Sequence, residues 1–128
     1  MHGTYCENAG VTDAARALVR SSDRPLAVLE LPSGEFLAVN PAFASALGST
    51  VDALVGSSSV ERLHPGERRA AQQCLQALAD GSLTGYQAVR RQASPGHPDE
   101  QFSIWVSVSD AGGTRVGLVS LAPYGGPG

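Results

Sequence analysis

The segment from Gly34 to Gly56 constrains the fold of this chain more than any other stretch of it. A tight turn is expected at Gly34, because this residue follows Pro32-Ser33. Phe36 to Val39 is apolar and ends in a β-branched residue, which predicts a short strand. Asn40-Pro41 then predicts the start of a helix, since proline is tolerated in the first helical turn and an asparagine side chain can cap the free N–H groups.

Two short helices are predicted after this strand. Phe43 and Leu47 are four residues apart and share one helical face, and the glycine that follows them is a typical helix end. Thr50 is a suitable cap for the second helix, which carries Leu54 and ends at Gly56. The whole segment therefore predicts a turn, a strand and two helices in close succession.

One further strand is predicted before this segment and three are predicted after it. Phe102 to Ser109 alternates apolar and polar residues, which is typical of an antiparallel strand with one buried face. The other expected strands are Leu26 to Leu31, Thr84 to Ala93 and Thr114 to Leu121, and the other expected helices are Thr12 to Arg20 and Glu67 to Ala79. Asp110 to Gly113 is expected to form a hairpin turn. Periodicity alone supports the α+β class.

Composition excludes several classes of protein. With 128 residues and 42% hydrophobic content, the chain is expected to form one soluble domain. The net charge of −3 gives no reason to expect nucleic-acid binding. No run approaches the ~18 apolar residues of a membrane span. We expect a cytoplasmic protein. Two cysteines are too few for a disulfide framework, and neither has a metal-ligand partner at a standard spacing, so no metal site is expected.

At this point the motifs resemble a known family. The run Gly34 to Phe43 (G-E-F-L-A-V-N-P-A-F), the T-V-D-A-L-V-G that follows and then Leu63-His64-Pro65 are similar to the motifs of PAS domains. Gly81 to Arg91 resembles the third strand of that family, and the two hairpin strands come after it. The resemblance covers residues 25–122.

The resemblance implies a five-stranded antiparallel sheet of order 2-1-5-4-3 with the helices on one face and an N-terminal flanking helix. We therefore expect an N-terminal extension at residues 1–24, a PAS-like domain at 25–122 and a flexible tail at 123–128. Many PAS domains end their last strand in a D-I-T-like coupling motif, whereas the corresponding end here is Leu121-Ala122-Pro123-Tyr124. Coupling through a C-terminal helix is therefore in doubt.

The inner face of the sheet is the expected ligand site, although the same residues would equally fill a core. Arg90 and Arg91 are neighbours on one strand, so one of them is expected to face inward and could bind a charged ligand; the alternative is that both lie on a solvated edge. The candidate pocket residues are Phe36, Phe43, Leu47, Leu54, Leu63, Leu75, Arg90, Ile104 and Val106.

No catalytic residue is predicted, and the identity of any cofactor is left open. The flavin-linking cysteine of the photosensing PAS subfamily has no counterpart in Gly56 to Leu63, which argues against covalent flavin. The long helix lacks the histidine that usually ligates haem in the family, and His64 and His97 are poor substitutes. Cys74 lies on the apolar face of that helix and is expected to be a small buried side chain, since no basic residue faces it along the helix.

A homodimer is expected, with Leu18, Val19 and Trp105 as candidate interface residues. PAS domains often dimerise through a flanking helix, but Thr12 to Arg20 could equally pack on its own domain. Trp105 shares a face with Ser103, Ser107 and Ser109, so the flanking helix or a partner subunit is expected to cover it; the alternative is a partly exposed aromatic side chain that packs through its stem.

The sequence thus favours a bacterial-type sensory or regulatory PAS domain that binds a small ligand or partner and relays a signal to an effector. A ligand-free dimerisation or interaction module is the alternative, and a small enzyme that uses the same cleft is a remote one.

Overall fold

The computed structural model describes residues 13–20, 22–91 and 101–123. Its elements follow in the order β1 (Leu26–Glu30), β2 (Phe36–Val39), α2 (Pro41–Ala46), α3 (Val51–Leu54), α4 (Pro65–Asp80), β3 (Gly85–Arg91), β4 (Gln101–Ala111) and β5 (Thr114–Pro123). Residues 13–20 form a further helix, named here the N-terminal helix. Residues 1–12 of the expected N-terminal extension, His97 and the expected tail beyond Pro123 lie outside the described residues.

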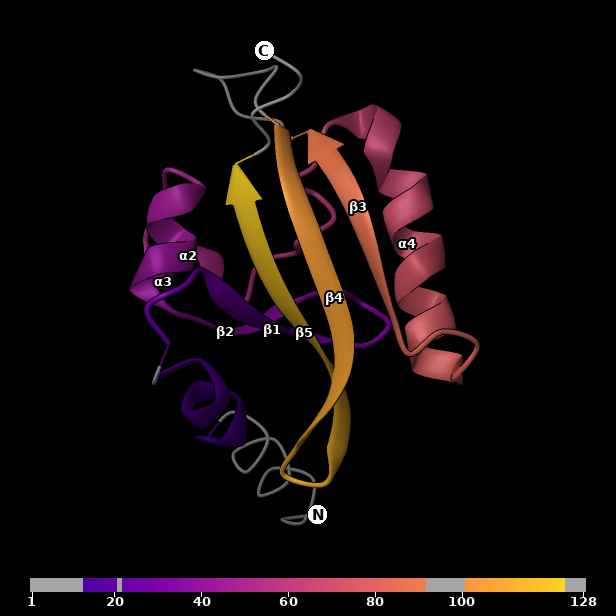
Figure 1. Cartoon of the computed structure of the whole chain (residues 1–128), viewed down its shortest axis with the longest axis horizontal. Coiled ribbons are helices and arrows are strands. Elements are labelled where there is room, and N and C mark those ends of the chain that lie inside the picture. Colours follow the sequence, from indigo (N-terminus) through magenta and orange to yellow (C-terminus); the bar gives the residue numbers. More distant parts are fainter. Residues whose placement is uncertain (1–12, 21, 92–100, 124–128) are drawn as a thin grey trace.

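The strands form one antiparallel sheet of order β2-β1-β5-β4-β3, as the family resemblance implied (Figure 1). β4 and β5 make a long hairpin that closes at Gly112-Gly113, with φ of 61° and 83°. The turn lies within the predicted segment Asp110 to Gly113 but is shorter, because two glycines with positive φ suffice to connect the strands, and pairing continues to Ala111 and Thr114. β5 also extends to Pro123, one residue past the expected domain end.

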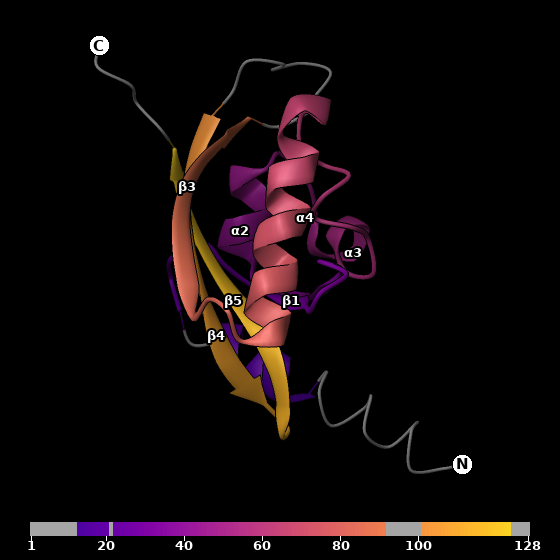
Figure 2. The ribbon, with the colours of Figure 1, turned by 90° about the vertical axis from the view of Figure 1, so that its right-hand side faces the viewer.

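The helices α2, α3 and α4 lie together on one face of the sheet (Figure 2). Asn40 and Thr50 cap α2 and α3 as predicted, through side-chain oxygens that accept from the N–H groups of Phe43 and Ala53. α4 begins at Pro65, two residues before the predicted start, because proline occupies a first-turn position that needs no N–H group. His64 caps this helix, and its Nδ1 accepts from the Gly66 N–H at 3.1 Å.

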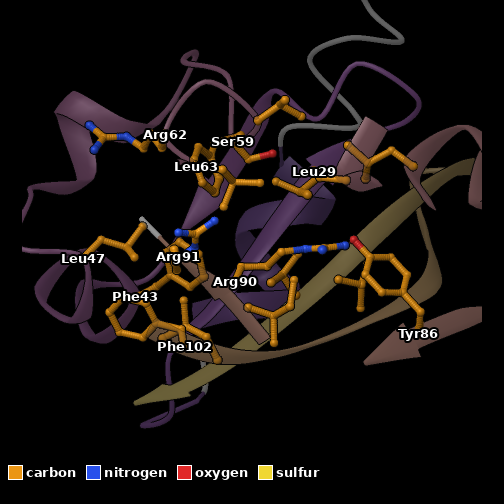
Figure 3. Close-up of a pocket in the computed structure, with 18 residues that line it drawn as sticks. Leu29, Phe43, Leu47, Ser59, Arg62, Leu63, Tyr86, Arg90, Arg91 and Phe102 are labelled. Carbon is orange, nitrogen blue, oxygen red and sulfur yellow. The ribbon is translucent and has the colours of Figure 1, made fainter. Parts of the chain in front are cut away.

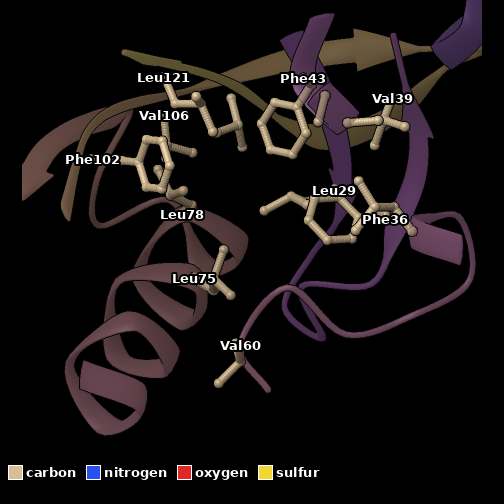
Figure 4. Packing of buried hydrophobic residues seen from close by; sticks show 14 residues of the cluster. Leu29, Phe36, Val39, Phe43, Val60, Leu75, Leu78, Phe102, Val106 and Leu121 are labelled. Atoms are coloured by element: carbon tan, nitrogen blue, oxygen red, sulfur yellow. The ribbon is translucent and has the colours of Figure 1, made fainter. Parts of the chain in front are cut away.

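The main core fills the space between the sheet and these helices. The Phe36 and Phe43 rings make an edge-to-face contact with centroids 5.6 Å apart. Leu75 and Leu78 of α4 face the strands from the opposite side (Figure 4). The alternation in β4 places Phe102 and Val106 in this core, as the sequence predicted.

A second, smaller core lies on the other face of the sheet. Ala15 and Val19 of the N-terminal helix are buried there against Val28, Ala38 and Val116. β1 is therefore covered on both faces, which explains its continuous apolar sequence. The N-terminal helix thus packs on its own domain in this structure.

Candidate ligand cavity

A cavity of about 80 Å³ lies between the inner face of the sheet and the start of α4. Most of its wall is apolar, and Figure 3 shows the Arg90 side chain in the middle of the view with its guanidinium beside the Tyr86 hydroxyl. Its lining consists of Leu29, Phe36, Phe43, Leu47, Ser59, Val60, Arg62, Leu63, Ala71, Leu75, Tyr86, Arg90, Arg91, Phe102, Ile104, Val106, Val119 and Leu121. Residues from every strand of the sheet and from α2 and α4 meet at this one place.

Strand parity positions Tyr86 and Arg90 on the cavity side of β3. Pairing places Tyr86 opposite Val106 and Arg90 opposite Phe102, both of which belong to the inner face of β4. The Arg90 side chain is only 11% exposed, so the alternative of a solvated Arg90 was wrong. Arg91 follows at the end of the strand and is more exposed, at 39%.

Glu67, in the first turn of α4, is the carboxylate that pairs with both arginines. Its Oε2 accepts from Arg91 Nε at 2.9 Å, and its Oε1 lies 3.7 Å from Arg90 Nη1. The hydrogen bond from Arg91 lowers the pKa of the Glu67 carboxyl, and the charge of Arg90 acts in the same direction. The pairing ties α4 to β3 beside the cavity.

Tyr86 places its hydroxyl next to the Arg90 guanidinium (Figure 3). Burial raises the pKa of this phenol, while Arg90 partly offsets the effect. The hydroxyl therefore stays neutral and adds a polar group to the wall beside Arg90.

Cys74 is only partly buried, and Arg90 Nη2 lies 4.0 Å from its sulfur. The expectation of a buried thiol was wrong; no basic residue faces Cys74 along the helix, as expected, but Arg90 approaches it from another element. The helical spacing identifies neighbours within α4, whereas Arg90 comes from β3, which folds alongside the helix.

Eight of the nine residues predicted for the pocket line this cavity; they are Phe36, Phe43, Leu47, Leu63, Leu75, Arg90, Ile104 and Val106. Leu54, the last residue of α3, is fully buried in the core and does not line the cavity. Tyr86 and Arg62 were not predicted for the pocket, and Arg91 was named only as the alternative to Arg90. Tyr86 shares the strand face of Arg90, so parity could have found it, whereas Arg62 lies in an irregular segment that gives no such signal.

Among the predicted interface residues, Trp105 alone is exposed. It lies on the outer face of the sheet, 43% exposed, and the N-terminal helix does not cover it. Val89, on the neighbouring strand, is 40% exposed. Val19 is buried against its own sheet, and Leu18 is half-buried beside it.

The described residues contain no group of His, Cys, Asp and Glu side chains that could hold a metal ion. Within the same residues, no helix is long and apolar enough to cross a membrane.

A family model described as the PAS fold matches residues 14–128 of the chain. No curated protein matches it in sequence.

Several solved PAS domains are similar to this structure. The PAS domain of an HTR-like protein from Haloarcula marismortui has a TM-score of 0.65 and 15% identity, and the match covers 97% of this chain and 100% of that one. The RpfR quorum-sensing receptor PAS domain from Cronobacter turicensis, in complex with BDSF, has a TM-score of 0.64 and 12% identity over 80% of this chain and 95% of that one. The Cycle PAS-B domain of Drosophila melanogaster, with bound ethylene glycol, has a TM-score of 0.64 and 12% identity over 78% and 99%. At these identities the similarity concerns the fold.

Proposed function

Because the chain belongs to the PAS family, whose fold is typical of sensory signalling proteins, we propose that it is a sensory domain that binds a small ligand in the cavity. The observation that carries the proposal is a cavity with an apolar wall and a buried arginine at one side. Cavities of this kind are the usual form of small-molecule sites. The proposal places the domain in the cytoplasm, attached to or beside a signalling effector, and assigns it no catalytic step.

The size of the cavity supports a ligand of few atoms. A volume of about 80 Å³ is several times the space that a single water requires, which is about 10–15 Å³ by the same kind of measure. An empty apolar void of this size would destabilise the fold by on the order of 2 kcal/mol. A ligand that fills it would recover part of this free energy.

β4 is the element through which occupancy would be relayed. Ile104 and Val106 line the cavity, while Trp105 between them faces outward. A ligand that displaces the inner side chains would therefore move the outer surface of the same strand. Such a ligand would shift the equilibrium between two arrangements of the sheet to the extent that it binds one better.

Mass spectrometry under native and then denaturing conditions tests this function. We expect the purified protein to carry an added mass that leaves on denaturation, and Ala71→Leu to lose it, because Ala71 lines the cavity. Ala70→Leu is the matched control, because Ala70 is the neighbour of Ala71 on α4 and its side chain is exposed. Equal added mass on Ala71→Leu and wild type would contradict binding in this cavity.

The exposed Trp105 favours a second function, assembly with another copy of the chain. A tryptophan that is 43% exposed on a sheet face, next to the exposed Val89, is a typical anchor of an interface. A ligand-free interaction module would use this surface alone, whereas a sensory dimer would use both the surface and the cavity.

A further inference from the structure

Arg90 is a buried cation whose contacts within the described part of the chain leave it poorly satisfied. Its Nε is buried and has no hydrogen-bond partner there. Its Nη1 lies 3.7 Å from Glu67, beyond hydrogen-bond distance, and its Nη2 has a sulfur at 4.0 Å. A guanidinium carries five N–H donors, and burying it without acceptors is costly. The Tyr86 hydroxyl beside the guanidinium is a neutral partner (Figure 3), so among the described residues Arg90 lacks a charged acceptor within hydrogen-bond distance.

The charges around the cavity point to an anionic acceptor. Its lining includes Arg62, Arg90 and Arg91 but, among the described residues, no aspartate or glutamate. Glu67 pairs with Arg90 and Arg91 from the first turn of α4 and neutralises only one positive charge. The Arg62 guanidinium points away from the other two (Figure 3), so Arg90 and Arg91 are the cations that a bound ligand would meet.

Glu67 is placed so that it leaves Arg90 available. Of the two arginines, only Arg91 donates a hydrogen bond to Glu67, at 2.9 Å. A ligand could therefore engage Arg90 without breaking that bond. Apart from Ser59 and the Tyr86 hydroxyl, the remainder of the wall is apolar and suits a hydrocarbon chain.

We infer, on the basis of the proposed sensory function, that the cavity binds a carboxylate on a short apolar chain, whose charged group pairs with Arg90. The carboxylate accepts from the Arg90 guanidinium, and the chain extends along the apolar wall. A carboxylate matches the forked geometry of arginine, and a charge-assisted pair of this kind is stronger than a neutral one.

NMR titration with butyrate and hexanoate tests the inference, with butanol, hexanol and butylamine as ligands matched in chain length and inorganic phosphate as a chainless anion. We expect the carboxylates to shift the Arg90 Nε–H resonance and to bind about tenfold or more tightly than the alcohols, because charge-assisted hydrogen bonds are lost in the alcohol. Butylamine and phosphate should not compete.

Variants separate charge recognition from a structural role. Arg90→Met should reduce carboxylate binding about tenfold or more while alcohol binding persists. Arg69→Met is the control, because Arg69 is exposed on α4, and it should bind like wild type. Glu67→Gln should tighten carboxylate binding, since it removes the competing negative charge.

The outcomes distinguish this inference from the proposed function. Equal binding of alcohol and carboxylate, or undiminished carboxylate binding by Arg90→Met, would overturn the inference and leave the sensory cavity standing. Phosphate that binds as tightly as hexanoate would overturn the role of the apolar chain. If none of these ligands bound the wild-type protein, the inference would fall, and the mass measurement would decide the proposed function separately.

Discussion

Asn40 connects three segments of the chain through one buried amide. Its Oδ1 accepts from the N–H groups of Leu26, at 3.1 Å, and Phe43, at 2.9 Å. Its Nδ2 donates to the carbonyls of Ser22, at 3.3 Å, and Arg24, at 2.7 Å. One residue therefore fixes the start of β1, the cap of α2 and the path that leads from the N-terminal helix. The sequence predicted only the cap, because the other partners are distant along the chain.

We predict that Asn40→Asp destabilises the protein by about 3 kcal/mol, because the donor is replaced by a negative oxygen that faces carbonyl oxygens in a buried site. The acceptor side, and with it the cap, is retained. Thr50→Ala is the control, since it removes an exposed cap and is expected to cost about 1 kcal/mol. Urea unfolding measures both variants, and a loss for Asn40→Asp no larger than that for Thr50→Ala would contradict the connecting role.

At the scale of elements, the N-terminal helix is held by burial on the outer face of the sheet. Val19 is 3% exposed there, whereas Leu18 is only half-buried. A helix as short as residues 13–20 is marginal in isolation, so its stability depends on this contact. The alternative, in which the helix packs across a dimer, would make the same contact depend on protein concentration.

We predict that Val19→Ala lowers the free energy of unfolding by about 2 kcal/mol, and Leu18→Ala by less, because the larger loss follows the more deeply buried side chain. Urea denaturation at two protein concentrations that differ tenfold is the measurement. The loss should be the same at both, since the contact lies within one chain. A loss that appears only at the higher concentration would favour the exchange of helices between copies.

Local signals predicted most elements, whereas contacts between elements that are distant in sequence gave no such signal. β2 and the caps of α2 and α3 were predicted correctly, because proline, asparagine and threonine act on backbone groups within three residues. Strand alternation likewise identified the cavity wall contributed by β4. The Arg90–Glu67–Cys74 cluster could not be predicted, because it joins β3 to α4 and depends on how the two elements pack.

At the scale of the whole molecule, the two faces of the sheet have different roles. Helices α2 to α4 cover the inner face around the cavity, while the N-terminal helix covers only part of the outer face. The uncovered part contains a shallow groove of about 290 Å³, whose wall includes Leu26, Trp105 and Leu118. A second copy that docks there would bury the exposed tryptophan, and serine neighbours such as Ser107 and Ser120 would allow close approach of its backbone.

We predict that Trp105→Ser weakens self-association about thirtyfold, which corresponds to a hot-spot contribution of about 2 kcal/mol. Val55→Ser is the matched control, because Val55 is 41% exposed but follows α3, far in sequence from the β3–β4 surface. Sedimentation velocity over a hundredfold range of concentration measures both variants. Trp105 is the only tryptophan of the chain, so its fluorescence should also shift to the blue as the wild type associates. If Trp105→Ser associated as tightly as wild type, or if the wild type stayed monomeric throughout, this face would not be a dimer interface. A movement of β4 on ligand binding would then have to be sensed by a different partner protein.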